Sequence, residues 1–288
     1  MRFSRLGILV LLTLTVLFGT NCSYYNRIIA RKNLVDGATA YKDRKFKVAE
    51  QLFRNAIARD PQLESTEGKM AQLFLARTLH SEYIGDRGLK EKAEQAIEEY
   101  KKVLSKDSND QSSFKAVANL LENLDRKDEA LQWITERANN ESVSNINRAE
   151  AFSSLAAKKN TCANDISDTD KTKKTITKDG KQVFQFVKPE NTADFDTLKK
   201  CADEGLALAS KAVELDPNSD SAWSYKTSLL VQKMRVAEME GNKEQEEQFK
   251  KESDTAKARF TELAAAKRQK EEEEEAKKKA EEEANKKK

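Results

Sequence analysis

Hydrophobic residues recur every three to four positions along much of the chain, which is the spacing of one face of an α-helix. The first predicted helix carries Gly37 and Tyr41, and polar residues 43–45 then interrupt the pattern. A second predicted helix follows, with apolar positions at Phe46, Ala49, Phe53, Ala56 and Ile57. Asp60-Pro61 ends the unit, since proline does not continue a helix. This pattern predicts two helices joined by a short turn.

Four later segments repeat the order of a first and a second helix: 70–107, 112–134, 149–217 and 221–263. Ala96 and Ala130 hold equivalent places in second helices and lie about 34 residues apart. Asp216-Pro217 closes its segment as Asp60-Pro61 closes the first. Only 9 Gly and 3 Pro occur in 288 residues, which favours long helices over a β-sandwich or barrel.

These landmarks resemble the tetratricopeptide repeat (TPR), a helix-turn-helix unit of about 34 residues with small, aromatic and proline positions. The resemblance covers residues 34–263 apart from one insertion. It implies an all-α fold, a TPR-like α-solenoid of about five helix pairs. One pair cannot bury both of its faces, so such repeats stack on their neighbours.

The helical pattern stops in the insertion 161–198, where the sequence KKTITKDGKQVFQFVKP predicts a β-hairpin. Asp179-Gly180 favours a two-residue turn, because both central positions need positive φ. Ile176 then lies opposite Val183. The second strand brings two aromatic residues to its other face, Phe184 and Phe186. The hairpin is either a packed decoration of the helices or an aromatic contact site for a partner.

The N-terminus has the layout of a secretory signal, in which basic residues precede about 7–15 apolar ones. Arg2 and Arg5 precede the apolar stretch 6–18, which is short for a membrane-spanning helix of about 20 residues. Residues 19–22, Gly-Thr-Asn-Cys, resemble a lipobox, which implies cleavage before Cys22 and its lipidation. The alternatives are an uncleaved signal anchor, and cleavage followed by release.

Cys162 and Cys201 bracket the insertion. In an exported chain two such cysteines favour a disulfide, which at this spacing stabilises the fold by about 4 kcal/mol. The alternative is a pair of free, buried thiols. Two cysteines without a nearby histidine supply too few ligands for zinc. Asp165, Asp168 and Asp170 lack the glycine and closing glutamate of a calcium loop, so we expect no metal.

Charge and motifs argue against nucleic-acid binding and catalysis. The net charge is +3, and basic residues alternate with Glu rather than forming a basic face. His80 is the only histidine, and no nucleophile motif, phosphate-binding glycine loop or HExxH helix accompanies it. We therefore expect no enzyme activity and no cofactor.

The resemblance implies that the first helix of each pair lines a concave groove. The residues expected there are Tyr41, Arg77, His80, Lys115, Asn119 and Glu122. Lys115 and Asn119, one turn apart, resemble part of the carboxylate clamp that holds peptide C-termini in some TPR proteins. The alternative is that these side chains form ordinary solvated faces.

The expected organisation is a signal peptide at 1–21, an anchor linker at 22–33, the repeat domain at 34–263 and a charged tail at 264–288, helical or disordered. The predicted function is a non-enzymatic TPR scaffold at the bacterial cell envelope. It would face the periplasm and bind proteins or peptides. In architecture it resembles lipoproteins of β-barrel assembly or pilus biogenesis. The alternative is a soluble periplasmic regulatory or ligand-binding subunit of an enzyme complex.

Overall fold

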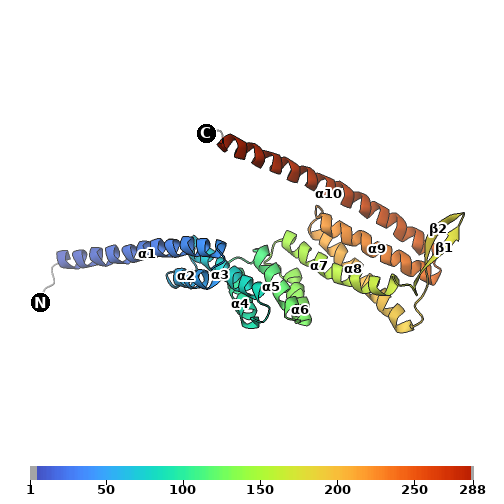
Figure 1. The fold of residues 1–288 in the computed structure, drawn as a ribbon, viewed down its shortest axis with the longest axis horizontal. Coiled ribbons are helices and arrows are strands. Elements are labelled where there is room, and N and C mark those ends of the chain that lie inside the picture. Colours follow the sequence, from blue (N-terminus) through green and yellow to red (C-terminus); the bar gives the residue numbers. More distant parts are fainter. Residues whose placement is uncertain (1–4, 287–288) are drawn as a thin grey trace. The chain divides into compact units, whose positions relative to one another are not determined.

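The computed structural model describes the backbone of residues 5–286 and the side chains of residues 24–282 (Figure 1). Within these residues the elements are α1 (Arg5–Lys42), α2 (Phe46–Ala58), α3 (Thr66–Gly85), α4 (Lys90–Lys106), α5 (Gln111–Asn123), α6 (Lys127–Asn139), α7 (Asn145–Ser167), β1 (Lys173–Lys178), β2 (Lys181–Phe186), α8 (Thr192–Leu215), α9 (Asp220–Glu240) and α10 (Lys243–Lys286). The predicted all-α architecture with one hairpin is confirmed. The side chain of Cys22 lies outside the described residues.

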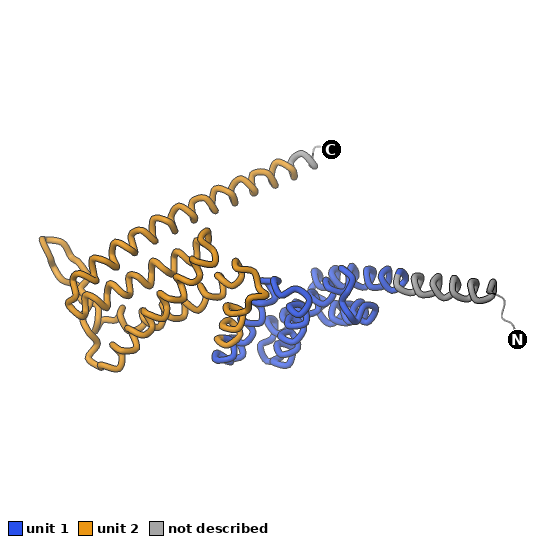
Figure 2. The backbone as a smooth tube through the Cα atoms, turned by 180° about the vertical axis from the view of Figure 1, so that it is seen from behind, with its two compact units in different colours: residues 1–130 blue, residues 131–288 orange. Residues whose placement is uncertain are grey.

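The chain forms two compact units, residues 1–130 and 131–288 (Figure 2). In the first unit α1 packs on α2, α2 on α3, α3 on α4 and α4 on α5. A Cβ atom added at Gly37 would lie 2.6 Å from the Phe53 ring, so α1 and α2 approach closely at this glycine. Ala49, Phe53 and Ala56 are fully buried, as their helical spacing predicts.

Three helices end in the same way, with a residue of left-handed backbone conformation. Arg44, Asp125 and Gly241 have φ values of 61°, 61° and 75°. In each case the next N–H donates to a carbonyl five residues earlier; the first of these bonds joins Lys45 N to Ala40 O at 2.8 Å. This is the Schellman ending, which satisfies terminal helix carbonyls. The turn recurs after α1, α5 and α9, each the first helix of a predicted pair.

In the second unit α7 packs on α8, α8 on α9 and α9 on α10. Ala156, Ala209 and Leu229 form a shared core, and a Cβ atom at Gly205 would lie 2.4 Å from Leu229 Cδ2. The helices flanking the insertion extend further than the sequence indicated. Ala163 of α7 is buried, and Asn191 caps α8 by accepting from Ala193 N at 3.0 Å.

The hairpin has the predicted register. β1 and β2 are antiparallel, with Ile176 opposite Val183. Asp179 and Gly180 in the turn have φ values of 51° and 74°, as a type I′ turn requires. The charged tail is helical as far as residue 286, and its side chains from 265 to 282 are exposed. No helix among the described residues combines the length and the hydropathy needed to cross a membrane.

Candidate functional site

One face of α3 is the strongest candidate for a binding surface in the first unit. Four of its side chains, Met70, Leu73, Arg77 and Ile84, are half-buried or exposed at helical spacing. On the opposite side Leu75, Ala76 and Leu79 are fully buried. α3 packs on α1, α2 and α4, so its remaining open face is held rigidly by its neighbours.

An aromatic and cationic cluster lies at this face. The Tyr41 hydroxyl is 3.1 Å from Ser81 Oγ, which joins α1 to α3. The Tyr41 ring meets the edge of Phe74 at 6.1 Å between centroids, and Phe74 stacks on Phe53 at 5.5 Å. The Arg77 guanidinium lies 5.6 Å from the Phe74 centroid, within the range of a cation–π contact. Two predicted groove residues, Tyr41 and Arg77, are thus brought together through Phe74.

A small apolar slot lies beside this cluster, with a volume of about 180 Å³. Its apolar lining consists of Leu63, Met70, Leu73 and Val103. Charged residues surround it: Lys69, Lys106, Asp107 and Asp110. Met70 and Leu73 were not among the residues predicted for the groove. Their spacing of three, followed by Arg77 four residues later, was the signal that places them on the groove face.

His80 points into the protein. Its Nδ1 atom is 3.3 Å from the Tyr100 hydroxyl of α4, and the two rings meet edge to face. Burial lowers the pKa of His80, and the nearby Arg87 charge lowers it further. Burial also raises the pKa of Tyr100, so both side chains are neutral near pH 7. His80 therefore packs against α4 through Tyr100.

The remaining predicted groove residues lie on α5. Lys115, Asn119 and Glu122 are exposed, and Asn119 Oδ1 accepts a hydrogen bond from Asn123 Nδ2 at 2.7 Å. α5 is joined to α3 by the Tyr83 hydroxyl, which donates to Asn123 O at 3.2 Å. This bond joins two of the helices that carry predicted groove residues.

The two predicted hairpin aromatics have different environments. Phe184 is 61% exposed, with Lys173 Nζ 4.4 Å from its ring centroid. Phe186 packs against the core cluster that contains Leu198, and the Arg235 guanidinium lies 4.4 Å from its ring centroid. Phe186 therefore docks the hairpin on the helices, and Phe184 remains open to solvent.

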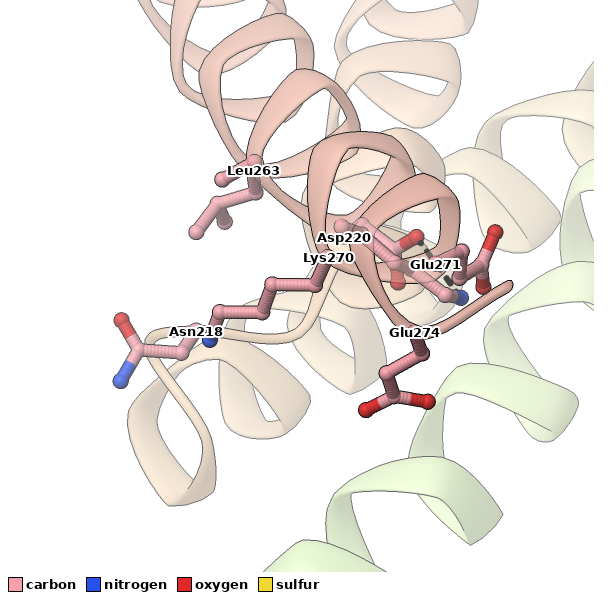
Figure 3. A pocket seen from close by; sticks show the side chains of 8 residues that line it. Asn218, Asp220, Leu263, Lys270, Glu271 and Glu274 are labelled. Atoms are coloured by element: carbon pink, nitrogen blue, oxygen red, sulfur yellow. Dashed lines mark hydrogen bonds and ion pairs between the residues drawn. The ribbon is translucent and has the colours of Figure 1, made fainter. Parts of the chain in front are cut away.

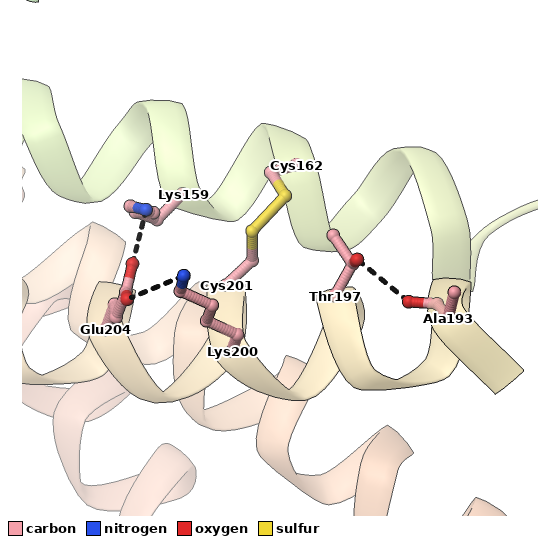
Figure 4. Close-up of a disulfide and its surroundings, with 7 residues drawn as sticks. All are labelled: Lys159, Cys162, Ala193, Thr197, Lys200, Cys201 and Glu204. Carbon is pink, nitrogen blue, oxygen red and sulfur yellow. Dashed lines mark hydrogen bonds and ion pairs between the residues drawn. A yellow bond between two sulfur atoms is a disulfide. The ribbon is translucent and has the colours of Figure 1, made fainter.

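Cys162 of α7 and Cys201 of α8 form the predicted disulfide, with Cα atoms 6.1 Å apart (Figure 4). Beside it Lys159 pairs with Glu204, whose other oxygen lies 3.9 Å from Lys200 Nζ. The bond fixes together the two helices that flank the hairpin insertion.

A polar cleft of about 520 Å³ lies between α10 and the loop that joins α8 to α9 (Figure 3). Its lining includes Asn218, Leu263, Lys270 and Glu274, and Lys267 Nζ pairs with Asp220 at 3.2 Å across it. Among the described residues there is no group of three His, Cys, Asp or Glu side chains able to hold a metal ion. One ion pair, between Lys267 of α10 and Asp220 of α9, therefore links the two helices at this cleft.

No family model matches this sequence, and no curated protein matches it. Similar solved structures include MamA 41-end from Desulfovibrio magneticus RS-1, at 13% identity and a TM-score of 0.39, covering 84% of this chain and 96% of that one. The structure of pilF from Pseudomonas aeruginosa is 14% identical with a TM-score of 0.38, and the match covers 84% of this chain and 99% of that one. YrrB, described as a TPR protein with an unusual peptide-binding site, is 14% identical with a TM-score of 0.38. This match covers 86% of this chain and 97% of that one. Because these TM-scores are below 0.5, the helix-pair assignment rests on the packing and turns described above.

Proposed function

We propose that this protein is a non-enzymatic scaffold of TPR type that binds a segment of another protein along the open face of α3. The observation that carries the proposal is the Tyr41–Phe74–Arg77 cluster beside the apolar slot. An aromatic and arginine cluster next to a small apolar pocket is the usual composition of a protein-binding hot spot. The slot admits one apolar side chain, and Arg77 offers a cationic contact close to it.

The proposed location is the bacterial cell envelope, with the chain exported and facing the periplasm. The sequence supports it through the apolar stretch 6–18 and Cys22, at which we propose lipidation. The Cys162–Cys201 disulfide supports it too, because disulfides persist in oxidising compartments. Two or more acyl chains at Cys22 would hold the protein stably on a membrane.

Binding is tested by capturing envelope proteins with the full-length chain and comparing two matched variants. Arg77→Gln removes the guanidinium beside Phe74, and Arg54→Gln removes an exposed arginine on α2 that pairs with Glu50. We expect Arg77→Gln to lose the proteins that the native chain and Arg54→Gln retain. Equal capture by both variants would remove the α3 face as the binding site.

Location is tested separately by fractionation and by the mass of the mature N-terminus. The proposal predicts that the protein is found in the membrane pellet and that detergent releases it. It also predicts a lipid-modified chain that begins at Cys22. An intact Met1 would show an uncleaved signal anchor. A mature chain in the soluble fraction would favour the soluble periplasmic subunit instead.

A further inference from the structure

The first described turns of α1 expose an unusual group of side chains. Tyr24, Tyr25 and Ile28 are 70%, 59% and 49% exposed. Spacings of three and four residues place them on one face of the helix. The opposite face is buried at Ala30 and Leu34 against the rest of the first unit. We call the exposed face, with Arg31 and Lys32 that continue it, the N-terminal patch.

The N-terminal patch is cationic as well as aromatic. Residues 24–35 include Arg27, Arg31 and Lys32 and contain no Asp or Glu. Arg31 and Lys32 are exposed. Arg27 pairs with Glu67 at 3.1 Å while its side chain stays 63% exposed. Isolated apolar residues on a surface are common, but three exposed within five residues beside a cationic stretch are more specific.

We propose that the N-terminal patch lies against the headgroups of an anionic phospholipid surface; the proposal rests on the proposed membrane anchoring. Tyrosine concentrates at the membrane–water interface, where its ring is apolar and its hydroxyl is hydrated. Lysine and arginine near the surface are attracted to anionic lipid phosphates. The sequence places the apolar stretch 6–18 and Cys22 immediately before the patch, so an anchor there brings the patch to the surface.

The orientation of the patch can be measured with tryptophan reporters at opposite sides of α1. Ile28 belongs to the patch, and Asn26 lies about 200° away around the helix, in a cleft with Arg59 and Pro61. The full-length chain is prepared with Trp133→Phe and Trp223→Phe, and with either Ile28→Trp or Asn26→Trp. It is reconstituted into phosphatidylglycerol-containing vesicles with brominated lipids, which quench tryptophan only at close range.

We expect loss of Ile28→Trp emission and little loss for Asn26→Trp, although Asn26 is nearer to Cys22 in the sequence. In the Ile28→Trp background, Arg31→Glu with Lys32→Glu should reduce the quenching. A control with the same charge change at exposed positions outside the patch, Lys42→Glu with Lys47→Glu, should not. Quenching should also fall in vesicles of phosphatidylcholine alone.

If the protein floats with the vesicles but both reporters are quenched equally, or neither is quenched, the patch proposal is overturned and the anchor is not. Quenching that is indifferent to lipid charge and to the Arg31/Lys32 reversal overturns the assignment to anionic headgroups. Failure of the full-length chain to float overturns the anchoring on which the proposal rests. The patch proposal would also be contradicted if the N-terminal patch were open to solvent in vesicles and covered by a bound protein in native envelopes.

Discussion

The backbone N–H of Phe186, at the end of β2, donates a hydrogen bond to Oε1 of Glu238 on α9 at 3.2 Å. Arg235, one turn earlier on α9, lies over the Phe186 ring and also donates to Ser167 Oγ and Asp168 Oδ2. A two-stranded hairpin is only marginally stable alone in water. These contacts explain how this hairpin is held in one position on the helices of the second unit.

Replacing Glu238 tests this attachment. Burial raises the pKa of Glu238 in the folded protein. The free energy of unfolding should therefore fall as the pH rises through that pKa, because the buried carboxyl group then becomes charged. Glu238→Gln keeps an acceptor for Phe186 N–H and removes the charge, so we expect unchanged or slightly increased stability at pH 7. Glu238→Ala loses the acceptor and should destabilise by about 1 kcal/mol. Chemical denaturation at pH 5 and pH 7 measures both, and greater loss in the Gln variant than in the Ala variant would contradict the contact.

Removing the disulfide should destabilise the second unit. Cys162 and Cys201 are 39 residues apart, and closing such a loop stabilises by about 4 kcal/mol on the chain-entropy model. We expect Cys162→Ser with Cys201→Ser to lose about that amount in chemical denaturation followed by a probe in the second unit. Reductant should destabilise the native chain and leave the double variant unchanged. A native chain indifferent to reductant, with both thiols labelled before reduction, would refute the bond.

Gly37→Ala tests the close approach of α1 and α2. The new Cβ atom would lie 2.6 Å from the buried Phe53 ring, and such overpacking costs about 1–3 kcal/mol. Gly85→Ala is the matched control, because a Cβ atom there meets nothing within 4 Å. Alanine is favoured over glycine in a helix, so the control should be neutral or more stable. Thermal unfolding compares the two, and equal stability would contradict the described packing.

His80 gives the first unit a predictable pH dependence. Its pKa is lowered from 6.5 in the folded state, so the unfolded chain binds the proton more readily. Stability should therefore fall as the pH drops through 6.5 towards the lowered pKa. Because His80 is the only histidine, one NMR titration of its ring protons measures the folded pKa without assignment. A value at or above 6.5 would contradict the buried position.

Much of the fold could be predicted because its signals are local. Apolar spacing located the helices, and Asp179-Gly180 specified the turn that aligns Ile176 with Val183. The glycines at the ends of these local signals behave as expected of glycine: Gly241 follows the last residue of α9 with positive φ. The ends of the insertion were less well predicted, since polar residues occupy the last turns of α7 and the first turn of α8.

The candidate site was predicted less completely, because its contacts join residues that are distant in sequence. Tyr41 contacts Phe74 and Ser81. The residues that neighbour these three positions in the sequence do not indicate that their side chains meet. His80 follows the groove pattern, yet its ring bonds to Tyr100 on the neighbouring helix. A helical pattern indicates which face a residue occupies, and the packing of neighbouring helices decides which side chains on that face stay open.

The most direct test of the scaffold account is site-resolved photo-crosslinking in intact envelopes. A photoreactive side chain at Met70 lies in the slot on α3, and one at the exposed Val48 of α2 serves as the control. Both are introduced into the full-length chain, and captured proteins are identified by mass spectrometry. The account predicts one or a few defined adducts at Met70 that Val48 does not form. Identical adducts at both positions, or none at Met70, would contradict a binding surface on α3.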